Sequence, residues 1–121
     1  MNKFAALLLV ALMFTNNASS QEIGDGTYTF TVAFAEWGGK SLGATCKVII
    51  KGEFITVIHD GNETLSGEKG EIIDKGLLIK HKETGSWIIG ASEKDALASE
   101  IGGCTGGPNI IELKKRIFWT C

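Results

Sequence analysis

Strict alternation of apolar and polar residues is the feature that most restricts the fold of this chain. From Thr27 to Glu36 every second residue shares one face of an extended strand, which brings together Tyr28, Phe30, Val32 and Phe34. The same period returns from Ala44 to Lys51, after a turn at 37–40. Because a strand with this period buries only one of its faces, the first half of the chain predicts antiparallel β structure.

Further short segments continue this pattern. Strands are predicted at 53–59, weakly at 64–66, from Ile72, at 77–82 and at 87–91, with 74–76 as one of the intervening turns. The segment 110–121 predicts one long final strand, and a hairpin turning at 114–116 is the alternative. A short helix is expected at 93–101, because Ser92 and Asp95 resemble a capping box and Gly102 can end the helix.

Six to eight antiparallel strands without βαβ spacing bury one face when the sheet closes into a barrel, and closure also removes the sheet edges. We therefore predict an all-β fold, a small antiparallel up-and-down β-barrel of about seven or eight strands with one short helix before the last strand. Its predicted interior consists of alternate residues from every strand: Tyr28, Phe30, Val32, Phe34, Val48, Ile50, Ile55, Val57, Leu77, Ile79, Trp87, Ile89, Ile111, Leu113, Ile117 and Trp119.

The start of the first strand adds a family resemblance. Gly26-Thr27-Tyr28 stands where the calycin group, which includes the lipocalins and their small bacterial relatives, commonly has Gly-x-Trp, and the meander and the helix before the last strand are similar to that group. The resemblance implies a lipocalin-like barrel in which Arg116 stacks against the opening aromatic residue, here Tyr28. We infer no ligand from it.

The N-terminus predicts export. Lys3 precedes the apolar run Phe4 to Phe14, and small residues at 18–20 offer a cleavage point after Ser20, as in a secretory signal peptide. The run is shorter than the roughly 20 residues of a membrane span, and we expect no such span elsewhere. The prediction is a signal peptide at 1–20 and a single β-barrel domain at 21–121, secreted or periplasmic.

Charge excludes one class of partner. Without Lys3, eleven basic residues face fourteen acidic ones, a net charge of −3. The only basic cluster, 114–116, has no interleaved aromatic residues and is typical of a solvated turn. We therefore expect neither nucleic acid nor a membrane surface as a partner.

All three cysteines lie beyond the predicted signal peptide, and an oxidising compartment allows disulfides. With a continuous last strand, Cys104 and Cys121 would lie roughly 36 Å apart at opposite ends of extended chain. Their pairing would need the hairpin alternative. Because the loop before the last strand is expected near the start of the strand that holds Cys46, the favoured bridge is Cys46–Cys104, with Cys121 free or paired between chains.

Three residues are candidates for ligand binding. His59 and His81 both fall at predicted inward positions, where two imidazoles in one cavity can hold a divalent metal or act as acid and base. The competing interpretation, which we favour, is that each histidine ends a strand and hydrogen-bonds a loop carbonyl; no HxH or HExxH spacing is present, so we predict no metal site and no cofactor. Trp37, in a glycine-rich turn, either caps the core or meets a ligand at the barrel mouth.

Two further patterns resemble binding motifs but lack required residues. Residues 60–71 match the oxygen positions of a calcium loop, yet Leu65 occupies the glycine position and the flanks are strands. The loop 102–108 (GGCTGGP) is glycine-rich but follows a helix and lacks the phosphate-loop lysine. Asn62-Glu63-Thr64 is a glycosylation sequon, relevant only in a host that modifies exported proteins in this way.

These observations favour an exported, non-enzymatic β-barrel that binds a small apolar molecule or a protein partner at one end. The expected site is bordered by Trp37, His59, His81 and the 102–108 loop. One alternative is an inhibitor of a secreted enzyme that uses the loop stiffened by Cys104. Another is a small hydrolase or metal-dependent enzyme that uses His59 and His81.

Overall fold

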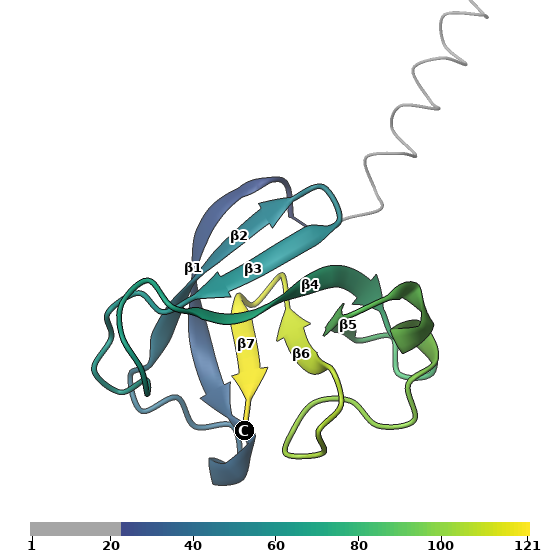
Figure 1. Ribbon diagram of the computed structural model, residues 1–121. Helices are drawn as coiled ribbons and strands as arrows, with labels where there is room; N and C mark the ends of the chain where they lie inside the picture. Colours follow the sequence, from purple (N-terminus) through teal and green to yellow (C-terminus); the bar gives the residue numbers. More distant parts are fainter. Residues whose placement is uncertain (1–22) are drawn as a thin grey trace, which may run out of the picture.

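A computed structural model describes residues 23–121 as a closed seven-stranded β-barrel (Figure 1). The predicted all-β barrel is confirmed. The predicted signal peptide lies outside the described residues, as do Gln21 and Glu22. The strands, in chain order, are β1 (Gly26–Phe34), β2 (Thr45–Lys51), β3 (Phe54–Ile58), β4 (Ile72–Lys80), β5 (Trp87–Gly90), β6 (Asn109–Glu112) and β7 (Ile117–Thr120).

Consecutive strands pair antiparallel, and β7 closes the barrel by pairing with β1 in parallel. The parallel closure follows from the odd number of strands, since the first and seventh members of an alternating series run in the same direction. Strand β1 serves both neighbours in turn: its first part, up to Thr31, pairs with β2, and Thr31 to Phe34 pair with β7.

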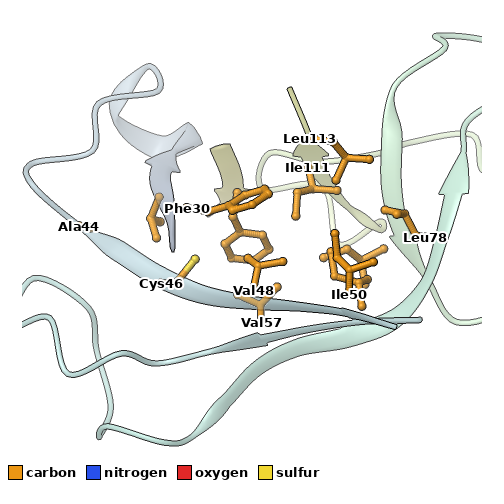
Figure 2. Packing of buried hydrophobic residues seen from close by; sticks show 13 residues of the cluster. Phe30, Ala44, Cys46, Val48, Ile50, Val57, Leu78, Ile111 and Leu113 are labelled. Carbon is orange, nitrogen blue, oxygen red and sulfur yellow. The ribbon is translucent and has the colours of Figure 1, made fainter. Parts of the chain in front are cut away.

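The inward faces of β1, β2 and β3 are those that the alternation predicted. Phe30, Val48, Ile50, Ile55 and Val57 are buried and form the centre of one hydrophobic cluster. Figure 2 shows Phe30, Val48, Ile50 and Val57 turned toward the same interior as Leu78 of β4 and Ile111 and Leu113. Burial of these aliphatic and aromatic groups supplies most of the free energy that holds a domain of this size together.

Strand β4 corrects the prediction for its region. Residues 72–80 form one strand, so no turn interrupts it at 74–76, and Leu78 is the buried residue in place of Leu77 and Ile79. Pairing of Asp74 with Val57 places Asp74 and then Gly76 on the inner face. A Cβ atom at Gly76 would collide with the carbonyl oxygen of Gly90, so glycine is required there for close strand packing and not for a turn.

The end of the chain is a hairpin and not one long strand. Strands β6 and β7 pair Ile111 with Phe118, and Arg116 in the connecting turn has a positive φ of 56°. Because an odd-numbered inward residue of β6 pairs with an even-numbered residue of β7, the inward parity changes across the turn: Phe118 is buried, and Ile117 and Trp119, both predicted inside, lie on the outer face. The Cζ atom of Arg116 lies 5.0 Å from the centre of the Tyr28 ring, the stack that the family resemblance implied.

Two short 3₁₀ helices complete the fold, η1 (Ala35–Trp37) and η2 (Glu93–Leu97). The second replaces the expected helix at 93–101 and ends at Ala98, whose ψ of 137° is extended. Asp95 accepts a hydrogen bond from the Ala91 N–H at 2.7 Å, which differs by one residue from a capping box. The predicted strand at 64–66 is absent from the loop between β3 and β4. Between residues 23 and 121, no helix is long and apolar enough to cross a membrane.

Candidate functional site

The disulfide joins Cys104 to Cys121, with a Cα–Cα distance of 5.0 Å. The predicted Cys46–Cys104 bridge is therefore wrong. The error came from assuming a continuous final strand, because the hairpin at 113–116 returns the C-terminus to the loop that carries Cys104. Cys46 is a buried free thiol in the core cluster, where burial, assisted by the negative charge of Asp60, raises its pKa to about 12. A thiol in this state is a small hydrophobic residue and not a nucleophile.

The loop 102–108 is shaped by close backbone contacts. The Gly102 N–H donates to the Pro108 carbonyl at 2.6 Å, and a side chain at Gly107 would collide with the Glu100 carbonyl oxygen. The disulfide ties this compact loop to the end of β7. An ideal Cβ on Gly103 would lie 4.0 Å from the Cβ of Ala35, so the loop also lies beside η1.

His59 is buried and holds the loop that follows β3. Its Nδ1 accepts a hydrogen bond from the Gly61 N–H at 2.9 Å, which leaves Nε2 to donate to the Leu65 carbonyl at 3.3 Å. Next to it, burial would raise the pKa of Asp60, but hydrogen bonds from the Thr45 hydroxyl and the Asn62 N–H, with nearby His59, outweigh burial and lower it.

His81 is also buried and performs the same task at another loop. Its Nε2 lies 2.7 Å from the Ala98 carbonyl, and its Nδ1 lies 2.9 Å from the Thr84 hydroxyl. The carbonyl only accepts, so Nε2 carries the proton and Nδ1 accepts from Thr84. This histidine fastens the residues after η2 to the β4–β5 turn.

The two histidines lie at opposite ends of the barrel. His59 follows β3 and His81 follows β4, and these neighbouring strands run antiparallel. The expectation that both face one cavity is therefore wrong, and they cannot act together as an acid–base pair. Trp37 lies at the same end as His59, because β1 runs parallel to β3 and η1 follows β1.

Three of the side chains in the calcium-like pattern already accept hydrogen bonds from protein groups. Asp60 accepts from Thr45 and Asn62, Asn62 Oδ1 accepts from the Thr64 N–H, and Glu71 accepts from the Glu68 N–H. Asn62 Nδ2, the atom that a glycan would modify, donates to the Gly43 carbonyl at 2.9 Å. In the part of the chain that the structure describes, no group of three or more His, Cys, Asp or Glu residues is arranged to hold a metal ion.

Trp37 belongs to a hydrogen-bonded loop that presents two large apolar side chains. Its indole is 47% exposed and contacts the Phe34 ring at 4.9 Å, and Leu42 is 59% exposed. Leu42 has a φ of 53°, a conformation that costs a bulky residue about 1–3 kcal/mol. The Thr64 hydroxyl donates to the Leu42 carbonyl at 3.3 Å and helps to hold the residue in this conformation.

A pocket of about 460 Å³ lies beside β6, in what we call the β5–β6 seam: residues 85–87 on one side, and 110–115 with Trp119 on the other. Only two residue pairs join β5 to β6, Ile88 with Ile110 and Ile89 with Asn109. Trp87 and Ile111, the next residues of the two strands, are not paired, and both line the pocket. The volume lies within the range of small-molecule sites.

The seam combines apolar surface with unequal charges. Glu112 is engaged by the Trp119 Nε1–H at 2.7 Å and by Lys115 at 3.8 Å. Lys114 has no ion-pair partner within residues 23–121. The indole nitrogen of Trp87 is buried and has no hydrogen-bond partner among residues 23–121, and the Lys80 ammonium lies 5.5 Å from the centre of the Trp87 ring. The seam therefore offers apolar walls and a net positive charge.

Comparisons with protein-family models, with curated proteins and with solved structures found no match for this chain. The candidate site thus rests on the geometry alone. Sequence reasoning placed Trp87, Ile111 and Leu113 in the interior but did not identify the seam. The only signal for the seam in the sequence is the basic cluster at 114–116 directly after apolar β6.

Proposed function

We propose that this protein is an exported β-barrel that binds a small, largely apolar molecule in the β5–β6 seam. The observation that carries the proposal is the pocket beside β6, lined by two tryptophans, at the place where the β5–β6 pairing ends after two residue pairs. A flat apolar body would pack between Trp87 and Leu113. An acceptor or anionic group on the ligand would meet the side that carries Lys114.

Export is part of the proposal. It is supported by the signal-like residues 1–20, and the Cys104–Cys121 disulfide is compatible with an oxidising compartment. Intact mass of the protein collected outside the cytoplasm tests it: the expected product begins at Gln21 and carries one disulfide. A product that retains residues 1–20 contradicts it.

Native mass spectrometry of the exported protein tests the ligand directly. We expect an organic adduct that is lost on denaturation. A second experiment uses the anionic fluorophore anilinonaphthalene sulfonate and the neutral fluorophore phenylnaphthylamine, both of which should gain fluorescence in the seam, the anionic one more strongly. Equal binding by unfolded protein contradicts a built site.

A matched pair of variants separates the seam from the rest of the surface. Ser86 lines the pocket, so Ser86→Phe should fill it and weaken fluorophore binding roughly tenfold, about 1.4 kcal/mol. Ser66 is exposed in the β3–β4 loop, so Ser66→Phe adds the same group elsewhere and should leave binding unchanged. Equal affinity of the two variants, both folded, rejects the seam as the site.

A second candidate function is binding of a protein partner, including inhibition of a secreted enzyme, through the end of the barrel that carries Trp37. The observation that favours it is the exposure of Trp37 and Leu42 on a strained but hydrogen-bonded loop, beside the loop of Cys104. Trp37→Ala should abolish such binding and leave fluorophore binding in the seam unchanged. The reverse result assigns Trp37 to the ligand site.

A further inference from the structure

The outer surface of β1 to β4, at the positions between the core residues, forms a continuous face. Strand register aligns Thr29 with Lys47, Lys47 with Ile58 and Ile58 with Ile72 across the four strands. A second row continues this face through Thr27, Ile49, Thr56 and Lys75, and a third through Lys51, Phe54 and Leu77. We call these three rows the β1–β4 outer face; β2, β3 and β4 lie side by side in Figure 1.

Several large apolar side chains on this face are exposed to solvent. Phe54 is 64% exposed and Ile72 is 55% exposed, although both belong to strands. Ile73, beside the irregularity in the β3–β4 pairing, adds a third large side chain. Exposed apolar groups that gather on one face mark an interaction surface more often than scattered ones do.

The charged residues in the three rows of the face are all lysines, in a chain whose net charge is −2. Lys47, Lys51 and Lys75 are exposed and have no ion-pair partner among residues 23–121, and no acidic residue occupies an outward position of β1 to β4. Carboxylates border the face at both ends. Asp25, which accepts a hydrogen bond from the Gly52 N–H, and Glu53 lie at the β2–β3 turn, while Asp60, which accepts from the Thr45 hydroxyl, and Glu71 lie at the other end.

We propose that the β1–β4 outer face is a docking surface for a protein partner with an acidic, amphipathic surface. The apolar groups of the partner would pack against Phe54, Ile58 and Ile72, and the carboxylates of the partner would pair with Lys47 and Lys75. A second copy of this chain is disfavoured, because a self-complementary contact would bring lysines together. A lipid surface is disfavoured because Glu53 and Asp25 lie beside Phe54 at the end that would insert.

The test uses a fluorescein-labelled helical peptide that has a leucine face bordered by glutamates. We expect binding that weakens with added salt, and that is lost when the glutamates are replaced by lysines or the leucines by serines. Lys47→Glu and Phe54→Ser should each weaken the affinity by roughly tenfold. Lys94→Glu, the same charge change on η2, should have little effect.

Several results overturn the proposal. Equal affinity of Lys47→Glu and Lys94→Glu places the peptide elsewhere. If the protein binds no peptide but sediments with phosphatidylglycerol vesicles, and Phe54→Ser abolishes this sedimentation, the face is a membrane-binding surface. Concentration-dependent dimerisation that Phe54→Ser abolishes assigns it to a second copy. Binding of none of these probes rejects a docking role. Unchanged thermal unfolding of each variant verifies that the fold is intact, and fluorophore binding in the seam is expected to persist throughout.

Discussion

The barrel has two walls of different construction. In the wall formed by β1 to β4, six residue pairs join β1 to β2, and five join each of the next two strand pairs. In the wall formed by β5 to β7, two pairs join β5 to β6 and two join β6 to β7. The first wall is a long hydrogen-bonded ladder, whereas the second needs other means of support.

Those other means are local and can be named. The second wall is held by the Cys104–Cys121 disulfide, by the bonds of His81 to the residue after η2, and by the Asp95 cap on the Ala91 N–H. The pocket lies where the β5–β6 pairing ends. The wall with fewer strand pairs is therefore the wall that contains the pocket, and local contacts stabilise it in place of a long ladder.

The largest effect is expected from removing an aromatic ring from either side of the shared core. Phe30 of β1 and Phe118 of β7 are both fully buried. Phe30→Ala and Phe118→Ala should each lower the free energy of unfolding by about 3–5 kcal/mol, measured by urea denaturation. A loss below about 1 kcal/mol at Phe118 would mean that the second wall does not share the core.

The disulfide sharpens the contrast between the walls. Cys104→Ala should cost about 3 kcal/mol, because the bridge closes a loop with a sequence separation of 17. Hydrogen exchange should accelerate first at 98–121 and least in β1 to β3. Cys46→Ala, which leaves the bridge intact, is the control for loss of a thiol. Uniform acceleration across both walls would contradict the tether.

The contrast between the walls also marks how far the sequence could be interpreted. Alternation predicted the faces of β1 to β3 because no residue interrupts it. Asp74-Lys75-Gly76 has the composition of a turn, yet Asp74 lies inside and its partner is Asn109, whose amide donates to it at 2.8 Å. That contact joins residues 35 positions apart and has no local signal.

The disulfide and the seam could not be predicted from the sequence for a related reason. Both depend on whether the chain turns at Lys114 to Arg116, which Lys115 marked as an interruption of the apolar parity. Once the hairpin is present, Cys121 reaches Cys104 and Trp119 moves to the outer face. The position at which β5 and β6 stop pairing follows from three-dimensional packing, so local pattern did not reveal it.

A smaller effect is expected at His81. His81→Ala removes the donor to the Ala98 carbonyl and should cost about 1–2 kcal/mol. Hydrogen exchange at the amides of η2 should accelerate more than hydrogen exchange in the barrel strands. Lys82→Ala, at the exposed neighbouring position, should stay within about 0.5 kcal/mol of the parent. Equal effects of the two substitutions would show that His81 does not fasten this segment.

The smallest effect is the pH dependence due to Asp74. Burial raises its pKa above the ordinary value of 3.8, and hydrogen bonds from Asn109 and the Lys75 N–H oppose the rise in part. Its stabilising contribution is therefore complete below pH 3.8 and is lost as the pH rises through the folded-state pKa. Over that pH interval, the free energy of unfolding of Asp74→Asn should increase relative to that of the parent protein. A constant difference between the two proteins would contradict the raised pKa.

The most direct test of the central claim follows the three indole N–H resonances during titration with anilinonaphthalene sulfonate. Trp87 and Trp119 line the seam, whereas Trp37 does not, although the Trp119 ring lies close to Gly39 in the turn after Trp37. The account predicts that the signals of Trp87 and Trp119 shift together and saturably while that of Trp37 stays in place. Movement of Trp37 alone, with Trp87 and Trp119 unchanged, would contradict it.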